Sequence, residues 1–101
     1  MYEVAFTAPA AEDYKKLDGS LKKLANAQID KLSENPLLGE ELGNKNNIDL
    51  TGYYKIYFAK KKYRIVYRII EFNQIEVVEI WGIGKRDKMA IYRTVANRRM
   101  T

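Results

Sequence analysis

Three strand-like segments follow one another in the second half of the chain with only short turns between them. Residues 53–59, 63–70 and 74–83 are rich in β-branched and aromatic side chains over the length of a strand. Residues 60–62 and 71–73 separate them, and connections this short join strands as hairpins. The three segments therefore predict an antiparallel meander around which the rest of the fold is built.

The first half predicts one more strand and a pair of helices. Residues 2–6 alternate, with Tyr2, Val4 and Phe6 on one face, as in a half-buried strand. Thr7 is a helix N-cap with Pro9 in the first turn, which predicts a helix to about Leu17. The turn Asp18-Gly19-Ser20 leads into a second helix that ends before Asn35-Pro36. Its apolar stripe consists of Leu21, Leu24, Ala25, Ile29 and Leu32.

The remaining segments predict a loop and a terminal helix. Residues 36–52 contain Gly, Pro and Asn and predict a long loop that Ile48 and Leu50 fix to the core. Gly82 and Gly84 are expected to end the sheet. A last helix is expected from Lys88 to about Asn97, with Asp87 as its N-cap.

Together these segments predict a single α+β domain over residues 1–101. We expect a small antiparallel sheet of about four strands, with the N-terminal helical hairpin packed on one face and a short C-terminal helix. The helices are expected on one face, which leaves the other to Lys55, Tyr57 and their neighbours.

Basic residues are concentrated in the second half of the chain. Residues 52–101 hold 12 Lys and Arg against 4 Asp and Glu, a net charge of +8, whereas residues 1–51 carry −3. Six of the eight tyrosines lie between Tyr53 and Tyr92. Cations interleaved with aromatic rings are typical of surfaces that bind nucleic acid.

The composition excludes several kinds of chemistry. The chain has no cysteine and no histidine, so it lacks disulfides, thiolate nucleophiles, and the usual general base and metal ligand. No apolar stretch is long enough to span a bilayer, and the N-terminus does not look like a signal peptide. We therefore expect a cytoplasmic protein with no metal, no small-molecule cofactor and no membrane partner.

Several short motifs occur in a fixed order along nearly the whole chain. They are the segment Ala11 to Leu17, Asn35-Pro36, Leu50-Thr51-Gly52, Tyr63-Arg64-Ile65-Val66-Tyr67, and Gly84-Lys85-Arg86 followed by Tyr92. In this order they resemble the RelE/ParE toxin superfamily, and within it the RelE-type messenger RNA interferases. The resemblance implies a RelE-like fold and a toxin that enters the ribosomal A site and cuts the mRNA there.

The resemblance also implies an active-site set. The first lysine of the family's set corresponds to Lys55 and the arginine of the next strand to Arg64. The arginine and the tyrosine that follow the last strand correspond to Arg86 and Tyr92. The position of the family's second lysine is occupied by Tyr57, which departs from the pattern.

Cleavage of this kind needs neither metal nor histidine, because the 2′-hydroxyl of RNA attacks its own 3′-phosphate. Arg64 and Arg86 suit the stabilisation of phosphate charge. Neighbouring cations are expected to lower the pKa of Lys55 so that it acts as the base. Tyr92 is expected to stack on a base or to protonate the leaving oxygen. The other cations expected to contact RNA are Lys60, Lys61, Lys62, Arg68, Lys85, Arg98 and Arg99.

The same residues also have purely structural interpretations. Arg64 and Arg68 alternate with apolar side chains and fit cross-strand pairs with Glu76 or Glu79. Tyr92 fits a core position, Trp81 is assigned to packing, and Arg98-Arg99 fits a solvated tail.

Three functions remain open at this point. The first is an endoribonuclease toxin whose partners are a cognate antitoxin and the ribosome with its mRNA and rRNA. The second is a ParE-type toxin of the same fold that inhibits DNA gyrase. The third is a non-catalytic basic RNA-binding module, which Tyr57 in place of lysine keeps open.

Overall fold

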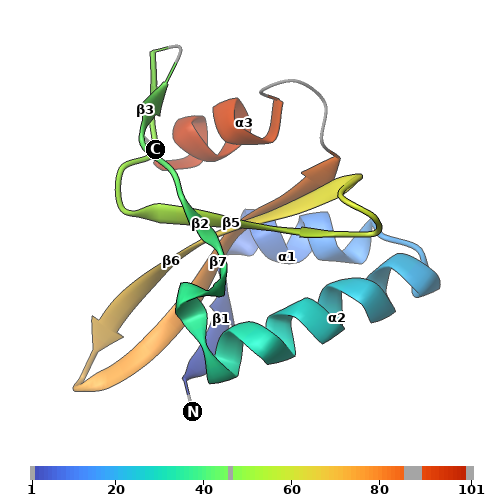
Figure 1. The fold of residues 1–101 in the computed structure, drawn as a ribbon, viewed down its shortest axis with the longest axis horizontal. Helices are drawn as coiled ribbons and strands as arrows, with labels where there is room; N and C mark the ends of the chain where they lie inside the picture. The colour runs from blue at the N-terminus through green and yellow to red at the C-terminus, as the bar shows by residue number, and fades with distance from the viewer. Residues whose placement is uncertain (1, 46, 86–89, 100–101) are drawn as a thin grey trace.

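The computed structural model of the protein describes residues 2–45, 47–85 and 90–99. Figure 1 shows its elements arranged around one twisted sheet. In chain order they are β1 (Glu3–Phe6), α1 (Ala8–Lys15), α2 (Gly19–Glu34), the 3₁₀ turn η1 (Pro36–Leu38), β2 (Glu40–Glu41), β3 (Asn44–Lys45), β4 (Ile48–Asp49), β5 (Tyr53–Phe58), β6 (Tyr63–Phe72), β7 (Ile75–Lys85) and α3 (Ala90–Arg99).

The sheet contains the predicted meander and two further strands. Its order is β1-β7-β6-β5-β2, while β3 and β4 form a separate hairpin. The antiparallel pairing of β5, β6 and β7 is confirmed. β1 runs parallel to β7, and β2 adds an edge strand inside the predicted loop. The expectation of about four antiparallel strands was therefore incomplete, because a parallel neighbour distant in sequence leaves no turn signal and β2 has only two residues.

The helix caps are those that the sequence predicts. The Thr7 side chain accepts a hydrogen bond from the N–H of Ala10, and Asp18 accepts one from the N–H of Leu21. The hydrogen bonds to Leu21 and Ser20 hold the pKa of Asp18 below its ordinary value. α1 ends two residues earlier than predicted, and α2 ends at Glu34, before Asn35-Pro36, as predicted.

Both hairpin turns use left-handed backbone without glycine. The β5–β6 turn has positive φ at Ala59, Lys60 and Lys61. The turn predicted at the three lysines, residues 60–62, is therefore confirmed. The β6–β7 turn is Asn73-Gln74, with φ of 51° and 67°, as a two-residue type I′ hairpin requires. The turn predicted at residues 71–73 thus lies slightly later, and both strands extend into the segments assigned to it.

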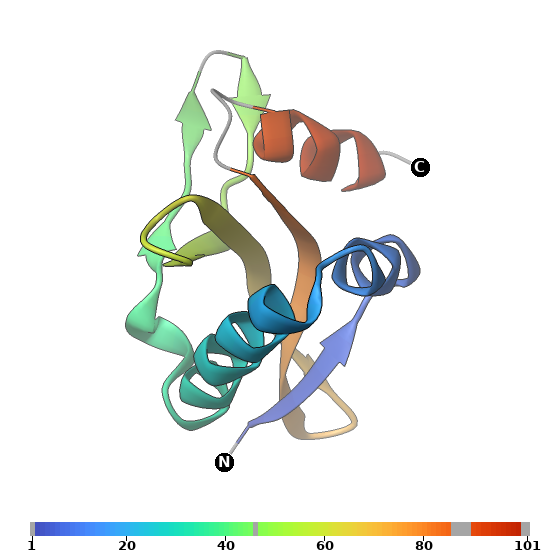
Figure 2. The ribbon, with the colours of Figure 1, turned by 90° about the vertical axis from the view of Figure 1, so that its right-hand side faces the viewer.

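Each face of the sheet carries its own apolar cluster. α1 and α2 cover one face, where Leu32, Ile65, Tyr67 and Ile80 are fully buried. α3 covers part of the opposite face together with the β3–β4 hairpin, over Val66 and the other residues of the second cluster. Figure 1 shows α3 on the other side of the sheet from α1 and α2, and Figure 2 shows the three helices after a turn of 90°. The expectation that all helices lie on one face was therefore wrong.

Glycines in β7 explain how α3 fits on this second face. Gly82 and Gly84 lie inside β7 and do not end it, contrary to the prediction. A Cβ on Gly82 would lie 2.7 Å from Cγ2 of Val95, and one on Gly84 would lie 3.1 Å from Cδ1 of Ile91. The glycines thus give the helix a flat surface on which it approaches the strand closely.

A salt bridge ties α3 to the opposite side of the molecule. Nη1 and Nη2 of Arg98 donate to the two carboxylate oxygens of Asp13 on α1, at 2.7 and 3.0 Å. Asp13 also accepts the backbone N–H of Ile83 at 3.1 Å, and Arg98 donates to the carbonyl of Trp81 at 3.0 Å. The Arg98 side chain is 21% exposed and the Asp13 side chain 14%, so water has little access to this ion pair. We call it the Asp13–Arg98 clamp.

The clamp predicts a stability difference between two neighbouring carboxylates on α1. Asp13→Asn should lower the free energy of unfolding by about 2 kcal/mol, because a half-buried guanidinium loses its charged partner. Glu12→Gln is the matched control, since its ion pair with Lys15 is exposed and worth at most about 1 kcal/mol. Urea denaturation of both variants measures the difference, and equal effects would contradict the importance of the clamp.

A buried tyrosine holds the loop after α2 against the sheet. The hydroxyl of Tyr67 donates to the carbonyl of Pro36 at 2.6 Å and accepts the N–H of Gly39 at 3.0 Å. Gly39 is required there, because a Cβ would lie 2.4 Å from that hydroxyl. Burial raises the pKa of Tyr67 to about 12.

Tyr67→Phe should destabilise the fold by about 2 kcal/mol at neutral pH, because two backbone groups lose their partner. In the unfolded chain Tyr67 ionises near its ordinary pKa of about 10, whereas the folded chain keeps the proton to about 12. Unfolding therefore releases this proton between these pH values, and stability falls as pH rises through the window.

The Tyr67→Phe variant should lack the loss of stability that ionisation of Tyr67 causes at alkaline pH. Tyr63→Phe, on the same strand and the same face, is the control and should retain it. Denaturation midpoints measured from pH 8 to 12 test the prediction. A fall with pH that is equally steep in Tyr67→Phe would contradict it.

Candidate active site

The predicted catalytic side chains gather on the sheet face beneath α3. Lys55 and Tyr57 project from β5 on the same face, and Arg64 lies directly opposite Tyr57 on β6. Tyr92 reaches them from α3. The structure thus brings together four of the five predicted residues, which we call the catalytic cluster after the role predicted for them: Lys55, Tyr57, Arg64 and Tyr92. Arg86 lies outside the described residues.

Arg64 is the centre of this cluster. It is only 6% exposed, and its Cζ lies 4.8 Å from the ring centroid of Tyr92 and 5.2 Å from that of Tyr57. Within the described part of the chain, Arg64 forms no ion pair and its Nε has no hydrogen-bond partner. Two aromatic faces stabilise the charge without neutralising it. The guanidinium is therefore held rigidly and keeps its capacity to bind an anion.

Lys55 lies beside Arg64 and contacts the same two rings. Its Nζ donates to the hydroxyl of Tyr57 at 3.0 Å, and the Tyr57 and Tyr92 ring centroids lie at 5.1 and 6.0 Å. The carboxylate of Glu40 on β2 is 3.8 Å away but largely exposed. Glu40 was missed in the sequence, because a two-residue strand inside a loop gives no pattern.

The expectation that neighbouring cations lower the pKa of Lys55 was wrong. Burial does lower this pKa, but the hydrogen bond to Tyr57 and the charge that Tyr92 and Tyr57 acquire when ionised outweigh it. The net effect is a raised pKa. Lys55 is therefore an ammonium ion near neutral pH, which does not fit the role of base expected for it.

Tyr92 is a neutral phenol in the same pH range. Burial raises its pKa, although the charges of Lys55 and Arg64 oppose the shift. No described group makes a hydrogen bond of good geometry to its hydroxyl, even though Lys55 lies near enough to affect its ionisation. The hydroxyl thus retains a proton that it can donate.

The exposed lysines lie at one end of the cluster. Lys60, Lys61 and Lys62 form the β5–β6 turn, and Nζ of Lys61 lies 5.9 Å from the ring centroid of Tyr57. Lys85 is exposed at the end of β7, opposite Tyr63 on β6. These lysines extend the positive charge of the cluster onto the surface.

Two of the arginines expected to contact RNA are instead engaged within the fold. Arg68 donates to Glu79 at 2.6 Å and stacks over Trp81 at 4.9 Å, which confirms the cross-strand interpretation and the packing of Trp81. Arg98 forms the Asp13–Arg98 clamp and is not part of a solvated tail. Arg99 is exposed, 5.9 Å from the ring centroid of Tyr53.

Two further properties of the described residues concern metals and membranes. Nowhere in residues 2–45, 47–85 and 90–99 do three or more acidic side chains gather as metal ligands would. In the same ranges, no helix is long and apolar enough to cross a membrane.

The raised pKa of Lys55 depends on Tyr57. Tyr57→Phe should lower the pKa of Lys55, because it removes the hydrogen bond that is the largest of the raising effects and leaves burial. Tyr54→Phe, on the opposite face of β5, should leave it unchanged. NMR titration of the Lys55 side chain in both variants measures the shift. A Lys55 pKa below the ordinary lysine value in the unmodified protein would contradict the assignment.

Comparison with known proteins places this chain and its fold in a family. The isolated RelE toxin of E. coli is 22% identical over 100% of both chains, with a TM-score of 0.69. The RelBE2 toxin–antitoxin complex of Mycobacterium tuberculosis is 27% identical over 84% of this chain and 91% of that one, with a TM-score of 0.63. The YoeB/ParE toxin of Agrobacterium tumefaciens is 19% identical over 84% and 99%, with a TM-score of 0.65.

A search of curated proteins finds no match. The family model that matches describes the ParE toxin of the type II toxin–antitoxin system parDE, and it covers residues 4–89. This span takes in the sheet except Glu3, the first residue of β1, as well as α1 and α2. The chain therefore belongs to the ParE toxin family of the RelE/ParE superfamily and is the toxin of a toxin–antitoxin system.

Proposed function

We propose that the protein is a metal-independent endoribonuclease that cuts mRNA in the ribosomal A site. The observation that carries the proposal is Arg64, buried between two phenol rings beside Lys55 with no ion-pair partner of its own in the described part of the chain. Fixed cations of this kind stabilise the charge that develops on a phosphate during cleavage. A purely structural arginine at this depth would be expected to pair with a carboxylate.

The chemistry follows from the protonation states in the cluster. The 2′-oxygen attacks the adjacent phosphorus, the bond to the 5′-oxygen breaks, and the products are a 2′,3′-cyclic phosphate and a 5′-hydroxyl. Arg64 and Lys55 bind the phosphate oxygens as permanent cations. Tyr92 donates its proton to the leaving 5′-oxygen. The 2′-proton passes to water, since Lys55 is already protonated and a phenol is a weak base near neutrality.

The surrounding surface suits the docking of RNA. The exposed cations Lys60, Lys61, Lys62, Lys85 and Arg99 contact mRNA and rRNA phosphates in this proposal. Arg86, which lies outside the described residues, keeps the phosphate-binding role that the family resemblance gives it. Arg68 and Arg98 are left out because Glu79 and Asp13 hold them. The cytoplasm, where ribosomes and mRNA occur, is the expected location. The E. coli and M. tuberculosis relatives are found in complexes with their antitoxins, and a cognate antitoxin is the protein partner we propose.

A second candidate is inhibition of DNA gyrase. The family model that matches is named for ParE, and the position of the second RelE lysine is Tyr57. Both observations favour this alternative, whereas the catalytic cluster favours RNA cleavage. A degenerate toxin that binds RNA without cutting it is the third possibility.

Two buried tyrosines of the apolar cluster beneath α3, one on β5 and one on α3, provide the test. Tyr53 and Tyr92 both have raised pKa values caused by burial, and the hydroxyl of each lacks a hydrogen-bond partner among the described residues. Tyr92→Phe should lower the single-turnover cleavage rate of mRNA on programmed ribosomes by about 100-fold or more, as expected for loss of a general acid. Tyr53→Phe should cut at the rate of the unmodified toxin.

Induction in cells without antitoxin separates the candidates. Growth arrest with cleaved mRNA supports the proposed nuclease. Arrest with intact mRNA and damaged DNA would replace it with gyrase inhibition. Absence of both arrest and cleavage would leave only the RNA-binding module.

A further inference from the structure

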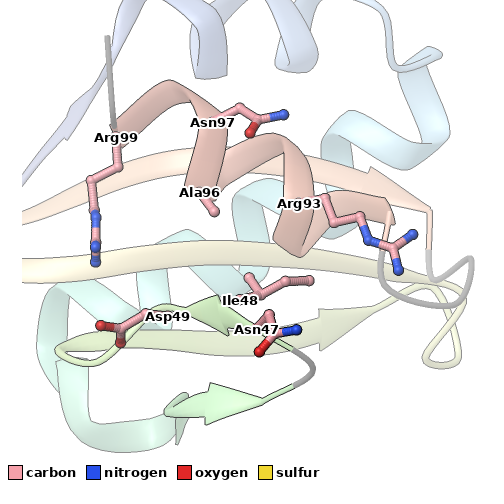
Figure 3. A pocket seen from close by; sticks show the side chains of 7 residues that line it. All are labelled: Asn47, Ile48, Asp49, Arg93, Ala96, Asn97 and Arg99. Atoms are coloured by element: carbon pink, nitrogen blue, oxygen red, sulfur yellow. The ribbon is translucent and has the colours of Figure 1, made fainter.

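A small furrow separates α3 from the β3–β4 hairpin, on the side of α3 that does not face the sheet. It has a volume of about 300 Å³, and its walls include Asn47, Ile48 and Asp49 on one side and Arg93, Ala96 and Arg99 on the other. Figure 3 shows these side chains. We call this feature the α3 furrow.

The charges of the α3 furrow lie at its two ends. Arg93 and Arg99 are six positions apart on α3, which places their Cα atoms about 9 Å apart along the helix axis. Figure 3 shows Arg93 and Arg99 at opposite ends, with Ile48 and Ala96 between them. Arg93 forms no ion pair with the residues that the structure describes. The furrow thus combines two spaced guanidinium groups with a short apolar centre.

The one carboxylate among the described residues of the furrow, Asp49, offsets only one of the two arginine charges. Asp49 accepts hydrogen bonds from the hydroxyl and the N–H of Thr51, at 2.6 and 3.0 Å. These two bonds lower the pKa of Asp49 most, and the charge of Arg99 adds to the effect. Asp49 is therefore ionised, and the two arginines with this one carboxylate leave the described walls of the furrow a net charge of +1.

We propose that the α3 furrow binds a short stretch of single-stranded RNA, about two nucleotides long at the spacing of its arginines. Arg93 and Arg99 each bind a phosphate, and one base lies over Ile48 and Ala96. The side-chain amide of Asn47 bonds to the edge of that base. The inference rests on the proposed RNA substrate and gives it a second contact site outside the catalytic cluster.

The chemistry of the furrow favours RNA over an acidic peptide. A guanidinium group can donate two parallel hydrogen bonds to two oxygens of one phosphate. A flat base can stack one of its faces on a small apolar surface. An amphipathic peptide would need a longer apolar stripe than the two side chains present here. Arg93 directly follows Tyr92 in α3, so RNA held in the furrow is positioned relative to the catalytic cluster by one rigid helix.

Binding of a short unstructured RNA to the full-length chain carrying Tyr92→Phe, which should not cut it, tests the site. Arg93→Gln with Arg99→Gln should weaken binding about tenfold or more and reduce the slope of log K against log salt by about 1.4, the value for two single-strand phosphates. Lys16→Gln with Lys23→Gln removes the same charge from exposed positions of the helical hairpin and should change neither quantity.

A neutral variant separates the base contact from the phosphate contacts. Asn47 has a φ of 62°, which glycine tolerates, so Asn47→Gly removes the amide without straining the backbone. It should weaken RNA binding several-fold and leave the salt slope unchanged, because no charge is lost.

The outcomes also distinguish this inference from the proposed function. RNA affinity unchanged by the double arginine variant would overturn the furrow site, even if the unmodified toxin cuts mRNA. If the double arginine variant loses antitoxin binding but keeps its RNA affinity, the furrow binds a protein partner and the proposed RNA site is overturned as well. If the expected losses occur but the unmodified toxin cuts no mRNA, the furrow site stands and the nuclease proposal fails.

Discussion

The close approach of α3 to β7 is the constraint on which the functional face depends. A ten-residue helix has little stability of its own and forms because its apolar side packs. Here Gly82 leaves room for Val95, and the Asp13–Arg98 clamp fixes the far end of the helix to α1. Tyr92 lies on this helix, so the geometry of the catalytic cluster is set by contacts that never touch a substrate.

This arrangement divides the basic half of the chain by role. Arg98 and Arg68 have structural roles. Arg98 holds α3 through Asp13, and Arg68 bridges β6 to β7 through Glu79. Arg64 and Lys55 are buried or half-buried and lie against the phenol rings of Tyr57 and Tyr92, and the one described carboxylate beside them, that of Glu40 near Lys55, is largely exposed. The exposed lysines form a third group at the β5–β6 turn. A net charge of +8 in this half therefore overstates the charge that is available to a ligand.

Local patterns predicted the meander and the capped helices, and the resemblance to RelE-type toxins predicted the grouping of Lys55, Tyr57, Arg64 and Tyr92. They did not predict the parallel pairing of β1 or the position of α3 across the sheet, because both depend on contacts between distant segments. Gly82 was misread for the same reason: a glycine that makes room for a helix looks like one that ends a strand. The role of Arg98 depends on Asp13, 85 residues away, and no local signal links them.

Tyr57 gives the cluster its particular chemistry. With a lysine at this position, two ammonium groups would repel each other and one would lose its proton more readily. The phenol instead accepts a hydrogen bond from Lys55 and presents its ring to Arg64, so it stabilises both cations in their charged forms. In the proposed reaction, a site with two permanent cations and no ready base binds a phosphate well but depends on water for the 2′-proton. We therefore expect correct placement of the RNA to limit the proposed cleavage, and contacts outside the cluster, such as those proposed for the α3 furrow, to contribute to the rate by fixing that placement.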